Sequence, residues 1–268
     1  MTDQNHASKD MAGSLAGKVA LVTGSSRGIG AGTARSFADS GAAVSIHSID
    51  LEEARRTATA IRESGGVAIA LRGDLRDEAQ CRALIHDTIR EFGQLDILVN
   101  NAGIYPRGSI ETTPVALWDE VFAINLRAPF ILCQEAVVHM KPRNGGSIIN
   151  IGSVNGVFGL PKLLAYSSSK GGLTTLTKNL SNAMTKYQIR VNQINPGWVL
   201  TEGERHVQTV IEKRGENWLE EIVKTRPFGR MLLPEDIAGA ALFLATSPLI
   251  TGAIIDYDQL PVGAPHEF

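Results

Sequence analysis

KVALVTGSSRGIG, residues 18–30, is the stretch that decides the fold of this chain. Its first five residues predict a short buried strand, and residues 31–40 after the glycines predict a helix that ends at Gly41. Gly24, Gly28 and Gly30 let the backbone turn tightly and approach a pyrophosphate, and the helix offers free N–H groups to it. Plain strand–helix turns also contain glycines, so the meaning of this loop depends on the rest of the chain.

Short apolar runs and longer helical segments alternate to the end of the chain. Further strands are expected at residues 43–47, 67–71, 95–99, 147–151, 189–194 and 253–257. Helices are expected at residues 51–64, 77–92, 115–140 with a bend near Pro129, 165–187 and 235–246. Such alternation forms a parallel sheet covered on both faces, with right-handed crossovers. We therefore predict an α/β fold: a single-domain Rossmann fold with a doubly wound, seven-stranded parallel sheet.

Composition limits the class of protein. The 268 residues, 43% of them hydrophobic, fit one large domain at residues 15–260. We expect a flexible lead-in at residues 1–14, which has no apolar core and so is no secretory signal, and a C-terminal tail at residues 261–268.

Charge, hydropathy and cysteine use exclude several partners. A net charge of −2 without a basic stripe argues against nucleic acid. No apolar run approaches the roughly 20 residues that a membrane span needs. Cys81 and Cys133 lack the spacing of metal ligands, so we expect no metal site and a reducing, cytoplasmic location.

Tyr166 and Lys170 lie four residues apart on the predicted helix 165–187. They share one face, with Cβ atoms roughly 5–6 Å apart. A lysine cation beside a phenol favours the phenolate and lowers the tyrosine pKa toward neutral. The pair could therefore exchange a proton with an alcohol or a ketone. Alone, an amphipathic tyrosine and a solvated lysine explain it as well.

Four further motifs surround this pair in a fixed order. They are the Gly-x-x-x-Gly-x-Gly loop at 24–30, Asn-Asn-Ala-Gly at 100–103, Ser153, and Asn-Pro-Gly at 195–197. With these motifs the chain resembles the short-chain dehydrogenase/reductase family of the classical type, from about residue 15 to about residue 258. Among its members, 3-oxoacyl-carrier-protein reductases and sugar dehydrogenases are similar.

The resemblance implies an NAD(P)-dependent enzyme that moves a hydride between a nicotinamide and a secondary alcohol or ketone. It implies that Tyr166 is the general acid/base and that Lys170 lowers its pKa and holds ribose hydroxyls. Ser153 should hydrogen-bond the substrate oxygen, and Asn125 should hold a water in a proton relay. Singly, Ser153 fits an ordinary strand-end serine and Asn125 a capping asparagine.

The resemblance also implies a set of cofactor contacts. Among them Asp74 and Leu75 should meet the adenine ring. The set is Gly24, Ser26, Arg27, Gly28, Ile29, Gly30, Ser48, Asp74, Leu75, Asn101, Ala102, Gly103, Tyr166, Lys170, Pro196, Gly197, Val199 and Thr201.

The choice between NADP and NAD depends on the end of the second predicted strand. An acidic residue there binds both ribose hydroxyls and repels a 2′-phosphate. Ser48 stands at that position, Arg27 could pair with a 2′-phosphate, and His47 could contribute weakly, so NADP is favoured. Asp50 lies only two residues further on, and an alignment shifted by that much would favour NAD.

The small-molecule substrate should meet a pocket that the resemblance places after Ser153 and in a lid. The expected contacts are Ser153, Asn155, Phe158, Leu160, Tyr166 and Trp198, with Tyr105 and Glu202 nearby. Residues 198–231 predict a long irregular loop that acts as the lid. A sugar or polyol and a 3-oxoacyl-type carbonyl both remain open as substrates.

Two further expectations come from the family. Its members commonly end the last strand with Asp-Gly-Gly, whereas Gln259 and Leu260 replace the glycine pair here. Its members are usually homotetramers that pair the two long helices, here 125–140 and 166–187. As alternatives, the chain could be a catalytically silent NAD(P)-binding regulator or an interaction domain.

Overall fold

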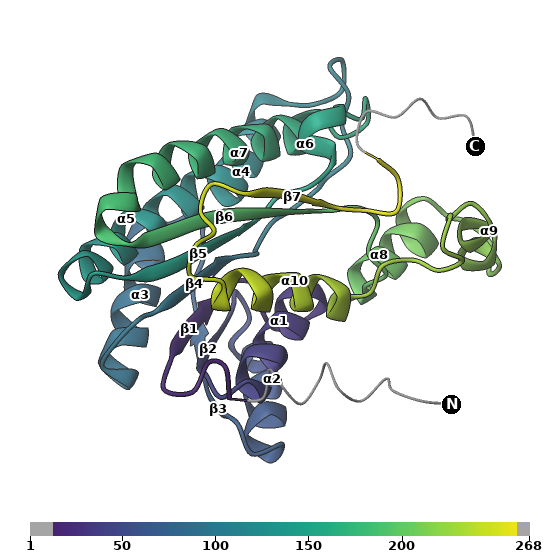
Figure 1. The fold of residues 1–268 in the computed structure, drawn as a ribbon. Coiled ribbons are helices and arrows are strands. Elements are labelled where there is room, and N and C mark those ends of the chain that lie inside the picture. The colour runs from purple at the N-terminus through teal and green to yellow at the C-terminus, as the bar shows by residue number, and fades with distance from the viewer. Residues whose placement is uncertain (1–12, 262–268) are drawn as a thin grey trace.

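Seven parallel strands form one sheet in the order β3-β2-β1-β4-β5-β6-β7 (Figure 1). The strands are β1 (Val19–Val22), β2 (Ala43–Ser48), β3 (Val67–Arg72), β4 (Ile97–Asn100), β5 (Gly146–Ile151), β6 (Ile189–Pro196) and β7 (Ile254–Tyr257). The predicted doubly wound sheet is confirmed. This computed structural model describes residues 13–261, so nearly all of the predicted lead-in and tail lie outside the described residues.

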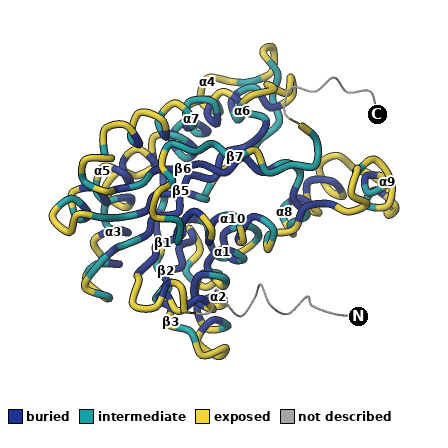
Figure 2. Tube along the Cα trace, in the orientation of Figure 1, coloured by how far each residue is buried: buried dark blue, intermediate teal, exposed yellow. Residues whose placement is uncertain are grey.

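Ten α-helices connect and cover the strands in the described part of the chain. They are α1 (Gly28–Asp39), α2 (Leu51–Glu63), α3 (Glu78–Phe92), α4 (Val115–Phe122), α5 (Ala128–Met140), α6 (Asn155–Phe158), α7 (Leu164–Met184), α8 (Glu202–His206), α9 (Trp218–Lys224) and α10 (Pro234–Thr246). Figure 2 shows the strands buried between helices whose outer sides are exposed.

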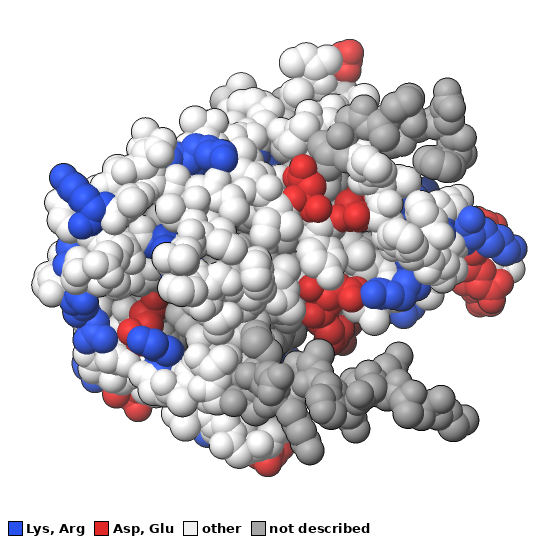
Figure 3. Space-filling view, in the orientation of Figure 1, with Lys and Arg blue, Asp and Glu red and all other residues white. Residues whose placement is uncertain are grey.

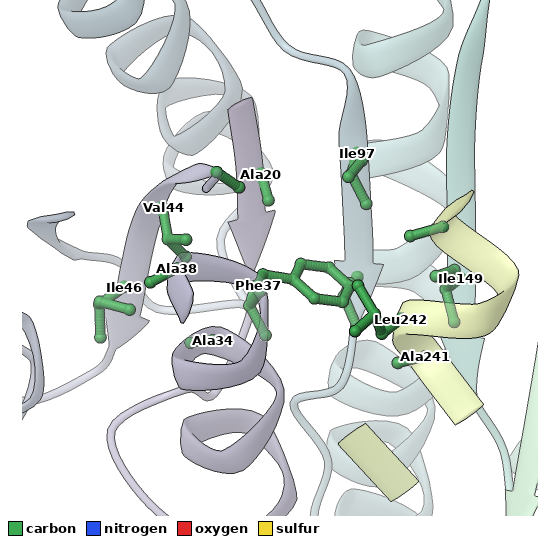
Figure 4. Packing of buried hydrophobic residues seen from close by; sticks show 14 of the residues in the cluster. Ala20, Ala34, Phe37, Ala38, Val44, Ile46, Ile97, Ile149, Ala241 and Leu242 are labelled. Carbon is green, nitrogen blue, oxygen red and sulfur yellow. The ribbon is translucent and has the colours of Figure 1, made fainter. Parts of the chain in front are cut away.

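The sheet has a hydrophobic core on each face, as expected for parallel strands. One core joins β1 and β2 to α1, α2 and α10, and the other joins the opposite face to α3, α5 and α7. Phe37 of α1 is fully buried, and in Figure 4 its ring points toward Leu242 of α10. The two residues hold α1 and α10 on the same face.

Two predicted segments differ from the structure. The bend expected near Pro129 is a π-helical turn, Ala123–Arg127, between α4 and α5. The loop expected at 198–231 is largely helical, with α8, a π-helical turn at Val207–Ile211, and α9. Around Trp218, Ile222 and Met231 this segment has a small hydrophobic core of its own, and in Figure 1 it projects beyond the sheet.

One helix of the described residues, Val115–Arg143, is long and apolar enough to cross a membrane by length and composition, although no unbroken apolar run of that length occurs in it. Half of its most apolar window is buried inside the protein. Core helices of soluble proteins have the same length and composition, so this single helix is weak support for a membrane span.

The strand order reverses between β1 and β4, which are neighbours in the sheet. In open α/β sheets, ligands bind beyond the carboxyl ends of the strands at such a switch point. The glycine loop follows β1 and residues 101–103 follow β4, so the topology brings these two predicted motifs together there.

Candidate active site

The glycine loop lies directly against the turn that follows β4. A Cβ at Gly30 would collide with the carbonyl oxygen of Gly24 and the side-chain amide of Asn101, so only glycine fits there. Asn101 donates to the carbonyls of Thr23 and Gly24 at 2.9 and 3.0 Å, and the amide of Ala102 donates to the Thr23 hydroxyl at 3.1 Å. This turn therefore fixes the shape of the loop.

The N-terminus of α1 is free to receive a phosphate. Asp50 and Asp77 cap α2 and α3 with their side chains, whereas α1 begins after Arg27 without a side-chain cap. Uncapped N–H groups and the helix dipole favour an anion. Gly28 has a φ of 55° and lies against the side chain of Thr201, which places Thr201 beside the loop. These residues fit the pyrophosphate of a dinucleotide.

His47 is buried and hydrogen-bonds to the backbone of the glycine loop. Its Nδ1 accepts from the amide of Gly24 at 3.0 Å, and Nε2 lies 3.1 Å from the carbonyl oxygen of Gly73, so the neutral ring donates there. Burial lowers the pKa of His47 to about 4, although the bond to Gly73 opposes this. The expected contact of His47 with a 2′-phosphate is therefore wrong.

Stability should depend on the protonation of His47. The unfolded chain, with its imidazole at the ordinary pKa of 6.5, takes up the proton before the folded chain does, so stability falls as pH drops from 6.5 to about 4. At about 1.4 kcal/mol for each tenfold change in proton affinity, the loss is at most about 3 kcal/mol. The free energy of unfolding, measured with urea at several pH values, should fall less steeply toward acid in His47→Asn than in the wild type. The exposed His206→Asn should show the same slope as the wild type. Equal slopes for His47→Asn and the wild type would contradict this role.

A carboxylate lies where the second ribose of a dinucleotide would be expected. Ser48 at the end of β2 is buried, and its hydroxyl lies 3.4 Å from Glu53 of α2. The hydroxyl of Ser26 in the glycine loop donates to the same Glu53 oxygen at 3.0 Å. Sequence reasoning missed Glu53 because it considered only the strand end. The sequence feature that could have identified Glu53 is its position in the first turn of α2.

The two residues expected at the adenine ring differ in exposure. Asp74 pairs with Arg76, whose hydrogen bonds lower the pKa of the Asp74 carboxyl. Leu75 belongs to the buried core on the α3 side of the sheet, so packing explains most of its side chain. Arg27 is exposed. Burial and then Glu204 raise the pKa of Tyr105, and Arg107 and Arg27 oppose this shift.

Ser153, Tyr166 and Lys170 come together as predicted. Ser153 follows β5, and its hydroxyl lies near enough to that of Tyr166 on α7 to act on the pKa of the phenol. The Ser153 amide donates to Asn195 at 3.2 Å, and its hydroxyl accepts from the amide of Asn155 at 3.1 Å. Lys170 is buried, donates to the carbonyl of Ile151 at 2.7 Å, and lies 5.7 Å from the centre of the Tyr166 ring.

The pKa values of this pair differ from the expectation. Burial raises the pKa of Tyr166 to about 12, opposed by the hydrogen bond with Ser153 and reinforced by Tyr105 and Glu204. Burial also lowers the pKa of Lys170 to about 8. The sequence predicts a lowered Tyr166 pKa, but burial raises it, and Lys170 is not among the groups that shift it. At neutral pH Tyr166 is thus a protonated phenol that can act as a proton donor.

Asn125 is fully buried in the π-helical turn between α4 and α5. Its amide exchanges two hydrogen bonds with the backbone of Ile104, at 2.9 and 2.8 Å, and donates to the hydroxyl of Ser169 at 3.1 Å. Its side chain therefore braces the turn after β4 against α7. A π-helical turn inside a helix is frequent at functional sites, since it changes the local backbone bonding.

The segment after β6 connects the sheet to the lid. Pro196 ends β6, and a Cβ at Gly197 would collide with the carboxylate of Asp258. Val199 is buried and pairs with Leu232. Among the predicted cofactor residues, Ile29 packs partly buried against the α1 core, and Gly103 lies beneath Lys170 and Asn125.

The predicted substrate contacts divide into two groups. Asn155 begins α6 beside Ser153, whereas Phe158 and Leu160 are 37% and 48% exposed. Trp198 packs in the lid core and donates its indole N–H to Glu204 at 2.7 Å. Glu202, expected in the pocket, is exposed, so Glu204 is the inward-facing acid that sequence reasoning missed.

The unusual chain ending joins the lid. The side chain of Gln259 accepts from the amide of Phe228 at 3.0 Å and donates to the carbonyl of Arg230 at 2.5 Å. A glycine pair at these positions would have no side chain to make these bonds. The replacement noted in the sequence thus ties the end of β7 to the segment after α9.

Charge is distributed without a continuous basic surface on the face in view. In Figure 3, Lys and Arg lie mainly toward the α3–α5 side and on the lid, and acidic side chains lie near the middle.

Comparisons with known proteins agree with this geometry. A family model described as short chain dehydrogenase matches residues 18–211. The L-fucose dehydrogenase of the rabbit, Oryctolagus cuniculus, is 39% identical over 233 residues, which cover 86% of this chain and 80% of that protein. A dehydrogenase/reductase structure from Sinorhizobium meliloti 1021 has a TM-score of 0.85 and 37% identity, covering 96% of this chain and all of that one.

One similar structure contains a nucleotide. It comes from Beutenbergia cavernae, carries a provisional name as an NAD(P) dependent gluconate 5-dehydrogenase, and has NADP bound at low occupancy. Its TM-score is 0.83 at 30% identity, and the match covers 91% of this chain and 96% of that one.

Proposed function

Because the chain belongs to the short-chain dehydrogenase family and is an oxidoreductase of that family, we propose that it interconverts a secondary alcohol and a ketone with NAD(P). The observation that carries the proposal is the placement of the Tyr166 hydroxyl by that of Ser153, with the buried cation of Lys170 5.7 Å from the centre of the Tyr166 ring. A regulator without catalysis would need the nucleotide cleft but not this arrangement of hydroxyls.

Each residue of the site has a separate task in the proposed reaction. The bound nicotinamide supplies or accepts the hydride. Ser153 holds the substrate oxygen, and Tyr166 gives it a proton when a ketone is reduced. Lys170 provides positive charge beside the developing alkoxide and can bind ribose hydroxyls. Asn125 positions the turn at 102–104, which we propose borders the ribose.

We propose that the protein binds both NADP and NAD with modest discrimination. Arg27 is an exposed cation beside the loop and Ser48 brings no negative charge, so both support NADP, as the sequence suggests. Glu53 opposes it, because its carboxylate lies by Ser26 and Ser48, where it would repel a 2′-phosphate and accept from a 2′-hydroxyl. The NADP-bound relative from Beutenbergia cavernae supports binding of this nucleotide by the fold.

Removing the charge of Glu53 should shift the choice toward NADP. We expect Glu53→Gln to raise the ratio of NADPH to NADH affinity by about tenfold, which corresponds to about 1.4 kcal/mol. The ratio is measured by titrating nucleotide fluorescence. Glu52→Gln is the matched control, since Glu52 precedes it on α2 but is exposed and pairs with Arg55. A wild-type preference above about 100-fold, or an unchanged ratio in Glu53→Gln, would contradict the proposed balance.

The function itself is tested by turnover. Purified protein is given NADPH or NADH with a panel of ketones, and NADP or NAD with the matching alcohols, while the absorbance of the reduced nicotinamide is followed. The panel should include sugars, polyols, simple secondary alcohols and 3-oxoacyl thioesters. Turnover of at least one member supports the proposal, whereas tight nucleotide binding without any turnover would support a regulator.

We also propose a cytoplasmic homotetramer. An apolar hollow between α4, α5 and α7 is lined by Phe122, Leu126, Phe130 and Leu176, and Phe130 is 46% exposed. Pairing of this face with a second copy would cover it. Three further apolar residues of α7, Leu173, Leu180 and Met184, pack inside the protein instead. Sedimentation of the purified protein would give the oligomeric state.

A further inference from the structure

Glu204 is a buried acid in the lid that has no cationic partner in the described part of the chain. It lies in α8 with 9% of its surface exposed. No lysine or arginine side chain within residues 13–261 forms an ion pair with it. Its Oε1 accepts from the indole of Trp198 at 2.7 Å and from the amide of Gln208 at 2.6 Å. A buried carboxylate is costly unless more of its lone pairs are used.

Glu204 and its neighbour Gln208 each have a side-chain oxygen that could accept a further hydrogen bond. The described residues give no hydrogen bond to Oε2 of Glu204, whereas both donors use Oε1. Gln208, one helical turn further, is 2% exposed, and its own Oε1 has no donor. Gln208 Oε1 is therefore a buried acceptor without a protein donor, whereas Oε2 of Glu204 lacks a donor but is not itself fully buried. A buried acceptor in the state of Gln208 Oε1 is unusual and indicates a missing partner, and Oε2 of Glu204 is accessible to the same partner.

The carboxylate is close enough to the reacting group to influence it. Its charge raises the pKa values of Tyr166 and Tyr105, and the two tyrosine rings meet edge to face with centroids 6.0 Å apart. A Cβ at Gly203, next to Glu204, would lie 3.5 Å from the Tyr105 hydroxyl. The backbone next to Glu204 therefore lies beside Tyr105, whose ring meets that of Tyr166.

Packing alone does not explain why a glutamate stands at position 204. Trp198 is already held by the lid core of Trp218, Ile222 and Met231. Arg226 lies over the Trp198 ring, 5.6 Å from its centre, and pairs with the ring and not with Glu204. A neutral side chain would accept the indole N–H without the cost of burying a charge.

We propose that Glu204, held in place by Gln208, binds hydroxyl groups of a polyhydroxylated substrate, a sugar or a polyol. The proposal rests on the proposed oxidoreductase function and narrows its substrate class. Hydroxyl groups are donors and can satisfy Oε2 of Glu204 as the lid packs on the substrate. The acyl part of a 3-oxoacyl thioester presents only acceptors near its ketone, so it would leave the carboxylate unpaired. Sites built for a hydroxyl reject analogues without it strongly.

The test separates hydroxyl recognition from a structural role of Glu204. In Glu204→Gln we expect KM for the best polyol of the panel to rise about 10–100-fold with a smaller change in kcat. For a simple secondary alcohol with a single hydroxyl, kcat/KM should change little in the same variant. Glu202→Gln, on the same helix but exposed, should behave as the wild type for both substrates.

A second measurement needs no variant and so does not depend on folding. The wild type is compared on one polyol and its deoxy analogues, each lacking one hydroxyl away from the reacting carbon. At least one analogue should lose about 10-fold or more in kcat/KM. An unchanged polyol KM in Glu204→Gln, equal use of all deoxy analogues, or a preference for 3-oxoacyl thioesters would overturn this inference alone. Absence of any turnover would overturn the proposed function together with it.

Discussion

We expect Tyr166→Phe to lower kcat for ketone reduction by about 10²–10⁴-fold, the usual contribution of a positioned general acid. The change removes only the hydroxyl that lies near Ser153. Phenylalanine keeps the ring that meets Tyr105 edge to face, so the cleft retains its shape. The affinity for NADPH, measured by fluorescence titration, should therefore stay within about twofold of the wild type, which is a change of about 0.4 kcal/mol in binding free energy.

Tyr105→Phe is the matched control for this variant. Burial raises the pKa of Tyr105 too, but neither Ser153 nor Lys170 is among the groups that shift it, so its hydroxyl should affect KM more than kcat. Because the pKa of Tyr166 is raised to about 12, reduction should be insensitive to pH through neutrality while alcohol oxidation, which needs the phenolate, should accelerate with pH. Turnover of Tyr166→Phe near that of the wild type would remove Tyr166 from the mechanism.

The parts of the site that lie in one local segment could be predicted from sequence. Strand–helix alternation gives the sheet, and its switch point brings the loop at 24–30 to the turn after β4. Tyr166 and Lys170 share a face because they are one helical turn apart. These relations need only short-range geometry or topology.

The contacts that sequence reasoning missed all depend on tertiary packing. Glu53 meets Ser26 across two elements, Gln259 meets the lid from the far end of the chain, and Glu204 rather than Glu202 faces inward. No periodicity identifies these partners. The pKa values of Tyr166 and Lys170 were also beyond prediction, because the degree of burial decides whether desolvation or the neighbouring charge is the larger effect.

Lys170→Met should destroy activity and yet stabilise the protein. Without nucleotide, the charged lysine is buried without an acidic partner, and burial lowers its pKa from 10.5 to about 8. Holding this charge inside at neutral pH costs the folded state up to about 3 kcal/mol, at about 1.4 kcal/mol for each tenfold change in proton affinity. Methionine has a similar length, removes this cost, and loses a hydrogen bond to Ile151 worth about 1 kcal/mol. We expect a net gain of about 1–2 kcal/mol in the free energy of unfolding.

The sign of the pH dependence separates this effect from ordinary core packing. The unfolded chain holds the lysine proton up to its ordinary pKa, so the wild type gains stability as pH rises from about 8 to 10.5, and the advantage of Lys170→Met should shrink over that window. Lys178→Met is the matched control, because Lys178 lies on the same helix and also donates to a backbone carbonyl, that of Gly252, but is exposed. It should gain no stability and keep its turnover, whereas Lys170→Met should lose about 10²–10³-fold in kcat, as when a preorganised charge is removed from a developing alkoxide. A Lys170→Met protein that is less stable than the wild type at neutral pH would show that the lysine charge is satisfied by groups other than Ile151.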